Sequence, residues 1–575
     1  MSSPLQAGRV ATFWGSAEVT APMPLQATSP RSEPRKLRAW TPRDMVLYVS
    51  FGATSCLLAG VFCVHLLSLF GATHAWAAWV ALGGLFGLSS AQAVVGWMRW
   101  LSMRRPEYVP PPQGLKVAMA TTFVPETESL AVLEQTLRAM VAVTYPHDSY
   151  VLDEGDDPRV RELCDSLGAR FYSRKARIDA ASGQRTKAGN LNAWVEDIGR
   201  ERYEFITFLD SDHAPIPQYL DRVLGYFSFS KVGYVQAPQT YRNQAMSLVA
   251  RGAAEHTYAY YGPYQRGLYG LGLTIIDGSH TTYRTRDWLL VGGMPEHLVE
   301  DLAMSYVMER AGVKGVYAPE VIAAGLAPED WGACLTQQYR WAAGGVDVRL
   351  RFQRSERSAL GRVARLFLLL HSLVYFRVLE VPLQRVLLAS LLVIGRFPKL
   401  SVALVASGLS LALLHWLANL WMQRFFISPE RERGILWRSV VVHHALWPTL
   451  VRATFDALRG RIAPRQVTPK SGRASTPLIA FLPHGVCALV ILIALLVSIA
   501  RGDHDAWLFR AFAVISAIVD GAVIAAALLS LSRDAQAQGS TVESQSKQAA
   551  VAARPADPSP QERQATRAER GRNFG

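Results

Sequence analysis

Long apolar runs near both ends of this chain constrain its fold more than any other feature of the sequence. Most of them reach the roughly 20 residues that a helix needs to cross the hydrocarbon core of a membrane. A long, more polar segment separates the two groups of runs, although 50% of all residues are hydrophobic and the mean hydropathy is +0.12. The pattern predicts a soluble domain inserted in a helical membrane bundle. The apolar runs lie at residues 45–72, 75–98, 382–394, 400–422, 477–499 and 507–531.

Basic residues indicate which side of the membrane each loop faces. The first two runs form a hairpin whose outer flanks, residues 35–43 and 99–105, are rich in Lys and Arg, whereas the connecting Thr73 and His74 carry no fixed charge. Such flanks favour the cytoplasmic side. Residues 360–378 are apolar but contain three Arg and one His, so we expect an interfacial helix there rather than a span. About six spans are predicted, with both termini in the cytoplasm.

The net charge of +14 could indicate nucleic acid or a membrane surface, and its distribution favours the second. Residues 422–473 contain ten Lys or Arg and three Asp or Glu, a net charge of +7 between two apolar runs, which is typical of a membrane-surface segment. No nucleic acid is expected as a partner.

Inside the last run, Arg510 and Asp520 are expected to form a structural ion pair. The five cysteines include no CxxC pair and predict neither a disulfide framework nor a zinc site.

The central segment has the texture of an α/β domain. Short β-type runs at residues 116–123 and 205–209 alternate with helical patterns such as residues 130–143, as in a mainly parallel sheet with flanking helices. The polar tails at residues 1–40 and 533–575 lack apolar periodicity, and we expect them to be disordered.

One carboxylate pair in this domain predicts a metal site. Asp210 and Asp212 directly follow the apolar run at residues 205–209, which places them at the carboxyl end of a predicted strand, where ligands bind in open α/β sheets. Mg²⁺ and Mn²⁺ prefer carboxylate oxygens. A divalent cation held here would bind a diphosphate. Taken alone, the pair could equally be a turn that ends the strand.

Further motifs stand around this pair in a fixed order. The sequence reads LDEG at 152–155, KAGNLN at 187–192, DSD at 210–212, VED at 299–301 and QQYRW at 337–341. In order and spacing they resemble the DDG, KAGNLN, DxD, TED and QxxRW motifs of processive family-2 glycosyltransferases, nearest to bacterial cellulose synthase catalytic subunits. The resemblance implies a GT-A-type domain in a bacterial inner (cytoplasmic) membrane protein.

The resemblance also implies a role for each matching residue. Asp301 corresponds to the general base that takes a proton from the acceptor hydroxyl. Asp210 and Asp212 correspond to the metal ligands, with Mg²⁺ or Mn²⁺ as cofactor. The donor site would be formed by Asp153, Lys187, Asp210, Asp212 and Arg340, and the acceptor site by Trp341, Gln337, Ser279 and Glu300.

Residues 465–470, RQVTPK, resemble the FxVTxK gating loop of cellulose synthases, with Arg465 in place of Phe. The resemblance implies that Thr468 and Lys470 close over the UDP diphosphate, as a lid that excludes water would. A basic loop beside a membrane could instead bind anionic lipid. A cyclic-di-GMP-binding domain after the last span is not expected, because only polar residues without strand patterns follow.

The implied function is polymerisation of a β-glucan, cellulose first, from UDP-glucose, with export of the chain to a periplasmic partner protein. Glu154, Val299, Asp277 and His280 depart from the family motifs. Alternatives are therefore curdlan, mixed-linkage glucan, a hyaluronan- or chitin-like polymer, a non-processive transfer to a lipid carrier, or a membrane scaffold with an inactive domain.

The predicted divisions of the chain are a tail (1–40), a membrane hairpin (41–105), the GT-A domain (106–355), a segment with interfacial helices, the gating loop and four spans (356–532), and a second tail (533–575).

Overall fold

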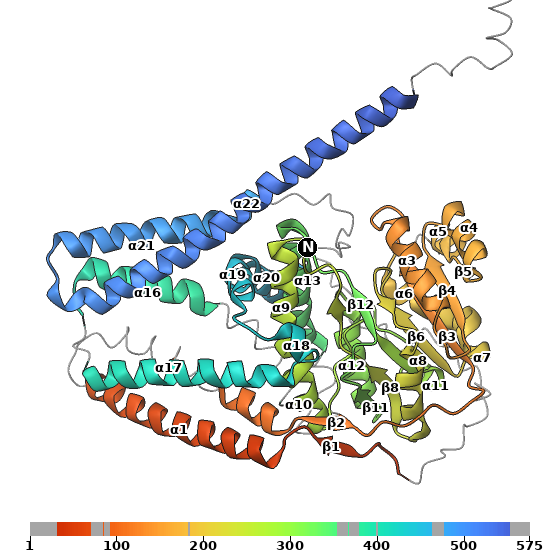
Figure 1. The fold of residues 1–575 in the computed structure, drawn as a ribbon, viewed down its shortest axis with the longest axis horizontal. Helices are drawn as coiled ribbons and strands as arrows, with labels where there is room; N and C mark the ends of the chain where they lie inside the picture. The colour runs from red at the N-terminus through yellow and green to blue at the C-terminus, as the bar shows by residue number, and fades with distance from the viewer. Residues whose placement is uncertain are drawn as a thin grey trace, which may run out of the picture. The chain divides into compact units, whose positions relative to one another are not determined.

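The computed structural model in Figure 1 describes residues 31–70, 93–181, 185–352, 379–397, 401–462 and 477–552, and the single residues Gly84 and Leu366. By its internal contacts the chain divides into two units, residues 1–524 and 525–575. The first unit contains the sheets and every site considered below. In the second, the described residues are the last part of helix α22 (Trp507–Ala552).

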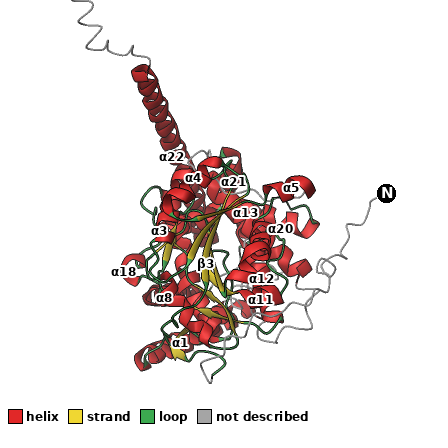
Figure 2. Ribbon diagram, turned by 90° about the vertical axis from the view of Figure 1, so that its right-hand side faces the viewer, coloured by secondary structure: helices red, strands yellow, loops and turns green. Residues whose placement is uncertain are grey.

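A seven-stranded sheet forms the centre of the α/β domain, between helices (Figure 2). In spatial order its strands are β11 (Lys314–Tyr317), β8 (Val232–Gln236), β10 (Thr281–Arg284), β6 (Phe205–Leu209), β3 (Val117–Phe123), β4 (Asp148–Asp153) and β5 (Arg170–Tyr172). Neighbouring strands are parallel except that β10 is antiparallel to both β6 and β8. The predicted mixed, mainly parallel sheet is confirmed.

The sheet is buried on both faces, and this explains its apolar strands. Every residue of β6 and of β8 is buried, as expected for a sheet covered by helices on each side. Along β3, Val117 and Met119 belong to one hydrophobic cluster, and Ala118 and Ala120 belong to another, because successive side chains of a strand point to opposite faces. The helices of this domain are α3 (Leu130–Val141), α4 (Pro158–Leu167), α5 (Lys175–Ala181), α6 (Lys187–Trp194), α7 (Arg200–Arg202), α8 (Tyr219–Val223), α9 (Leu248–Ala259), α10 (Gln265–Gly270), α11 (Thr285–Leu290), α12 (Glu300–Arg310) and α13 (Trp331–Asp347).

Two smaller sheets flank the main one. Strands β7 (Ala214–Pro215), β12 (Ala323–Gly325) and β9 (Thr240–Tyr241) form a three-stranded sheet, and β1 (Lys36–Arg38) pairs with β2 (Arg104–Pro106). The strand at β1 corrects the expectation that residues 1–40 are disordered throughout. In the second predicted tail, α22 continues through residues 533–552.

Four described helical segments are long and apolar enough to cross a membrane. Helix α1 (Pro42–Phe70) packs beside α17 (Val402–Met422), and α21 (Leu482–Ala500) packs beside α16 (Glu380–Ile394), as Figure 1 also shows. The candidate spans within the described residues are Pro42–Leu67, Val402–Phe425, Leu478–Ala500 and His504–Leu531.

The predicted count of six spans is not reached by these four and stays a prediction. Most of the second predicted run, residues 75–98, lies outside the described residues. Helix α16 has 15 residues and is therefore roughly 22 Å long, shorter than the ~30 Å hydrocarbon core. Apart from Leu366, the expected interfacial helix at 360–378 also falls outside the described part of the chain.

The expected pairing of Arg510 with Asp520 is wrong. Asp520 accepts a hydrogen bond from Arg385 on α16 (3.1 Å) and lies 3.0 Å from Nδ1 of His484 on α21. Arg510 instead donates to the hydroxyl and carbonyl oxygens of Ser498. The charged side chains thus join different apolar helices, rather than positions on one helix.

The basic segment after α17 packs on the α/β domain. Its helices are α18 (Pro429–Glu432), α19 (Trp437–Ala445) and α20 (Trp447–Arg459). Helix α19 packs on α9, and α20 packs on α13, where Tyr339 Oη donates to Asp456 Oδ2 at 2.8 Å. Helix α13 carries the QQYRW motif, so this segment helps to fix the motif in place.

Candidate active site

The motifs meet where three strands end at one edge of the sheet. Strand β3 lies between β4 and β6, with Phe123 opposite Asp153 and Thr121 opposite Leu209. The residues after β4 and β6 therefore emerge together, on the two sides of β3. The antiparallel strand β10 begins at this same edge, with Thr281 opposite Phe208. A sheet edge of this kind is where α/β folds bind ligands.

A cavity of about 270 Å³ opens at this edge. Among the described residues that line it, nine are acidic, against three Lys or Arg. Such a lining attracts cations and repels a diphosphate that arrives without one. The acidic residues are Glu128, Glu154, Asp210, Asp212, Asp277, Glu300, Asp301, Glu329 and Asp330, and the basic residues are Arg185, Lys187 and Arg340.

Lys187 links the KAGNLN motif to the DSD motif. It is the first residue of α6, where Thr186 caps the helix by accepting the backbone N–H of Gly189 at 3.0 Å. Its ammonium group donates to Asp210 Oδ1 at 2.5 Å and to the carbonyl of Gly278 at 3.1 Å. The ammonium thus lies beside the predicted metal ligands, within the cavity that would hold a diphosphate.

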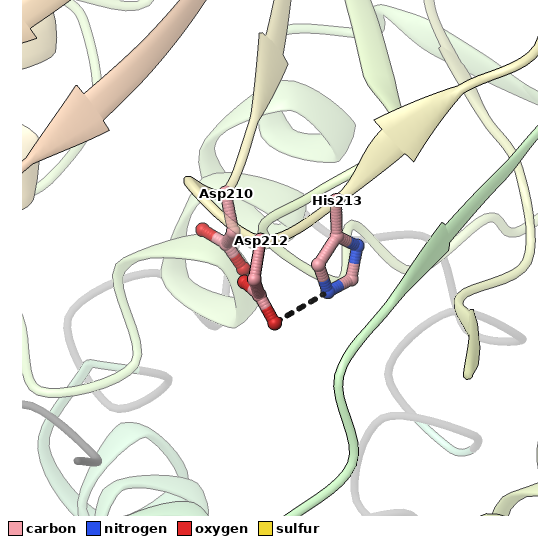
Figure 3. Close-up of side chains that lie close together, drawn as sticks. All are labelled: Asp210, Asp212 and His213. Carbon is pink, nitrogen blue, oxygen red and sulfur yellow. Dashed lines mark ion pairs between the residues drawn. The ribbon is translucent and has the colours of Figure 1, made fainter. Parts of the chain in front are cut away.

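Asp210, Asp212 and His213 form a cluster that fits a divalent cation (Figure 3). One donor atom from each lies within 4.8 Å of the others. Asp212 Oδ2 accepts the backbone N–H of Leu326 at 2.9 Å, which fixes the buried carboxylate. Two carboxylates and one imidazole suit a first-row ion such as Mn²⁺, and the carboxylates also suit Mg²⁺.

Asp301, the predicted general base, lines the cavity at the start of α12. Burial of the carboxyl group, assisted by repulsion from Glu300, raises the pKa of Asp301 to about 6. A carboxylate with this pKa is largely ionised at neutral pH and more basic than an exposed one. Gly278 approaches it so closely that a Cβ atom there would lie 2.6 Å from Asp301 Oδ2.

Asp277 is a second carboxyl group in the wall, at a position that departs from the family motif. It receives hydrogen bonds from Tyr260 Oη at 2.7 Å and Gln265 Nε2 at 2.8 Å. Burial, with repulsion from Asp301, raises the pKa of Asp277 to about 8. At neutral pH the group is mostly protonated, so the two neighbouring carboxyl groups differ in charge.

Helix α13 presents one face to the cavity. Its N-cap Asp330 accepts the backbone N–H of Ala333 at 2.9 Å. Gln337, Arg340 and Trp341 all line the cavity, because residues three and four apart lie on the same side of a helix. This face of α13 thus presents the guanidinium group of Arg340 and the indole ring of Trp341 to the cavity.

Two predicted site residues, Asp153 and Ser279, are not among the described residues that line the cavity. Asp153 is fully buried, and its oxygens accept the backbone N–H groups of Gly155 and Asp157, while the next residue, Glu154, lines the cavity. Ser279 is also buried, and its hydroxyl accepts the N–H of Asp210 at 3.1 Å. In that position Ser279 supports the backbone of the candidate metal site, and its acceptor role stays a prediction.

The remaining predicted donor and acceptor residues described by the structure line one cavity: Lys187, Asp210, Asp212, Gln337, Arg340, Trp341 and Glu300, with Asp301 beside them. Their roles stay predictions. Thr468 and Lys470 lie outside the described residues.

Sequence reasoning missed three contributors to the site. His213 follows the DSD motif directly, so an imidazole next to two carboxylates was the signal that could have found it. Glu128 comes from the loop after β3 and accepts the hydroxyl of Ser211 at 2.5 Å. Arg174 forms a buried ion pair with Glu154 and donates to the carbonyl of Thr186 at 3.0 Å, which no local pattern indicated.

The acid limb of a pH profile should report the ionisation of Asp301. We expect kcat/KM for sugar transfer to fall about tenfold per pH unit once the pH drops below the pKa of about 6, because a protonated carboxyl cannot accept a proton. Glu300→Gln should move the limb to lower pH, since the charge of Glu300 raises the pKa of Asp301. Asp277→Asn should leave it in place. If the acid limb moves in Asp277→Asn but not in Glu300→Gln, the group whose ionisation controls kcat/KM is Asp277 rather than Asp301.

Comparisons with known proteins show which proteins the central part of this chain resembles. Residues 118–344 match the family model described as glycosyltransferase like family 2. The cellulose synthase catalytic subunit (UDP-forming) of Pseudomonas fluorescens is 29% identical over 236 residues, 39% of this chain and 31% of that protein. Its counterpart from Komagataeibacter sucrofermentans, with the same description, is 28% identical over 236 residues, 39% of this chain and 30% of that protein. Each match therefore spans less than a third of its relative.

Among solved structures, a mannosyltransferase from Pyrobaculum calidifontis in complex with GDP-Man and Mn²⁺ is similar with a TM-score of 0.43 and 15% identity. The alignment covers 72% of this chain and 99% of that one.

Proposed function

We propose that this chain, whose residues 118–344 form a family-2 glycosyltransferase domain close to that of cellulose synthase catalytic subunits, is a processive inverting glycosyltransferase. It polymerises a β-glucan, with cellulose as the first candidate, from UDP-glucose. It then passes the product across the bacterial inner membrane.

One observation carries the proposal. A single cavity gathers the Lys187 ammonium group, the Asp210 and Asp212 carboxylates, the Asp301 base and the α13 face with Arg340 and Trp341. These groups supply what sugar transfer from a nucleotide requires: charges for a diphosphate, a base for a hydroxyl and an aromatic surface for a sugar.

In the proposed reaction, Asp301 accepts the proton of the acceptor hydroxyl as its oxygen attacks C1 of the donor sugar. The bond from C1 to the diphosphate oxygen breaks, UDP leaves with the electron pair, and attack from the opposite face converts an α-linked donor into a β-linked product. Lys187 and Arg340 stabilise the charge on the leaving diphosphate. A divalent cation at Asp210 and Asp212, when bound, supplies Lewis-acid stabilisation of the same charge.

The acidic lining supports metal dependence. Because acidic residues outnumber Lys and Arg in the cavity wall even when the mostly protonated Asp277 is left out, a diphosphate needs additional positive charge to bind there. Mg²⁺ or Mn²⁺ fits the oxygen donors present. Transfer should therefore stop in a chelator and resume when the cation is restored.

The packing of α13 on the basic segment that lies between two candidate spans supports coupling of synthesis to export. Helix α13 bears the acceptor-side Trp341 and packs on α20, which belongs to the basic membrane-surface segment. A growing glycan and the lipid bilayer are thus the proposed partners, with a periplasmic export protein beyond them. Thr468 and Lys470 are proposed to close over the diphosphate.

The test is product analysis with the full chain purified in detergent. Radiolabelled UDP-glucose and UDP-N-acetylglucosamine are supplied separately with Mg²⁺ or Mn²⁺, and any polymer is digested with linkage-specific glucanases. A high-molecular-weight product from UDP-glucose that a β-1,4-specific glucanase degrades is expected. A polymer from the amino sugar, or one resistant to that glucanase, would overturn the choice of cellulose. A short, lipid-soluble product would instead indicate non-processive transfer.

Trp341→Ala should shorten the polymer more than it weakens donor binding. The indole ring lines the cavity on the α13 face, and loss of an aromatic surface removes roughly 1 kcal/mol or more of contact with the bound sugar. We expect product length, measured by size-exclusion chromatography, to fall severalfold with little change in the Kd for UDP. Trp437→Ala, which truncates an exposed tryptophan on α19, is the matched control. Equal shortening in both variants would contradict the acceptor role.

A further inference from the structure

Two buried imidazole rings, those of His213 and His280, contact each other next to the carboxylates of Asp210 and Asp212. His213 Nδ1 lies 2.7 Å from His280 Nε2, and His280 Nδ1 lies 2.8 Å from the carbonyl oxygen of Pro238. Both histidines are buried, His280 completely.

The chemistry of the partners fixes where the protons lie. The carbonyl of Pro238 can only accept, so Nδ1 of His280 carries a hydrogen. Among the described residues, the hydrogen-bond partners of this fully buried ring are an imidazole and a carbonyl, so it stays neutral and carries one hydrogen. Nε2 of His280 must then accept, and Nδ1 of His213 must donate to it. The hydroxyl of Ser279 is a second, longer contact of the same nitrogen, at 3.2 Å.

This arrangement leaves the lone pair of His213 on Nε2, the nitrogen that faces the carboxylates. His213 Nε2 lies 3.9 Å from Asp212 Oδ2 (Figure 3), too far for a hydrogen bond. One donor atom from each of Asp210, Asp212 and His213 lies within 4.8 Å of the others, which is close enough to share one ion. A histidine that binds a metal usually donates its other N–H to a fixed acceptor, which sets the tautomer and the ring orientation.

The backbone of His280 is unusual as well. Its φ of +58° lies in the left-handed region, which a residue with a Cβ adopts at a cost of roughly 1–2 kcal/mol. The hydrogen bonds at both ring nitrogens hold the side chain in this position. Leucine has a similar volume but can accept no hydrogen, whereas the Oε1 atom of glutamine can reach a position similar to that of Nε2.

We propose that His280 is a positioning residue, which holds His213 of the metal cluster in the tautomer that leaves Nε2 able to bind the divalent cation, and that this nitrogen makes the site favour Mn²⁺ over Mg²⁺. The inference rests on the proposed metal dependence of the site. Mg²⁺ takes oxygen ligands almost exclusively, whereas Mn²⁺ also accepts an imidazole within a mainly carboxylate site.

The experiment measures metal binding by the full chain in detergent, without any sugar nucleotide. Free Mn²⁺ is followed by electron paramagnetic resonance during titration, and Mg²⁺ is then added as a competitor. We expect His280→Leu to weaken Mn²⁺ binding about 10- to 100-fold and to reduce the preference for Mn²⁺ over Mg²⁺. His280→Gln should restore most of both.

A spectroscopic signature separates ligation from general stability. In the wild type, the bound Mn²⁺ should show electron spin echo modulation by ¹⁴N of an imidazole. This modulation should disappear in His213→Ala and weaken in His280→Leu. The matched control is His147→Leu, because His147 also bonds to backbone carbonyls but lies outside the cavity lining, and this variant should bind Mn²⁺ as the wild type does.

Absence of ¹⁴N modulation in the wild type, or equal Mn²⁺ affinity in the wild type and His280→Leu, would overturn the inference. Neither result depends on sugar transfer. If Mn²⁺ binds as expected but no UDP-sugar is turned over, the proposed function fails and the metal site stands.

Discussion

Asp301→Asn is expected to reduce sugar transfer about 10²- to 10⁴-fold, the usual contribution of a general base, while UDP binding and the fold remain. Asparagine keeps the shape of the side chain but cannot accept a proton from a hydroxyl. The raised pKa of Asp301 means that burial already disfavours the charge, so a neutral amide should not destabilise the cavity wall. Initial rates of UDP release, with thermal unfolding as a check on folding, would measure the effect.

The control for this variant is Asp165→Asn, which makes the same chemical change on an exposed residue of α4. It should keep the wild-type rate. Polymer accumulating at the normal rate in Asp301→Asn would show that another group acts as the base, and Asp277, which also lines the cavity, would then be the next candidate. Loss of UDP binding together with activity would indicate a damaged donor site instead.

Features encoded by neighbouring residues were predicted well. Strand β6 has the bounds 205–209 that the apolar run indicated, β3 starts one residue later than the predicted run at 116–123, and α3 ends at Val141 rather than at residue 143. A continuous apolar run that ends in Asp defines a buried strand clearly, because the carboxylate cannot continue into the core. The acidic residues that follow β6 line the cavity at the end of the sheet, because they come directly after the buried strand.

Contacts between distant residues could not be read from the sequence. His213 and His280 are 67 residues apart, and their alignment depends on β10 running antiparallel to β6. Asp520 pairs with Arg385, 135 residues away, rather than with the nearby Arg510. At the end of β4, the side chains alternate in direction, and this decides that Glu154 rather than Asp153 lines the cavity. Hydrophobic patterns give no sign of such partners.

Gly278 shows how backbone and catalysis depend on each other. Its φ of +81° lies in the left-handed region, and a Cβ atom would lie 2.6 Å from Asp301 Oδ2, which is well inside contact distance. Gly278→Ala must therefore displace the carboxylate, or move the loop whose carbonyl accepts a hydrogen bond from Lys187. Misplacing a reacting group by about 1 Å costs on the order of 10²-fold in rate, so we expect kcat to fall by about that factor.

The strain of the left-handed backbone can be separated from the contact with Asp301. Gly272 has a φ of +85°, but a Cβ atom there would meet nothing within 4 Å. Gly272→Ala and Gly278→Ala should both lose roughly 1–2 kcal/mol of stability from the backbone alone, measured by thermal unfolding. If only Gly278→Ala loses activity, the loss comes from the displaced base. Equal loss in both variants would instead assign it to the backbone, and the close approach of Gly278 to Asp301 would have no part in catalysis.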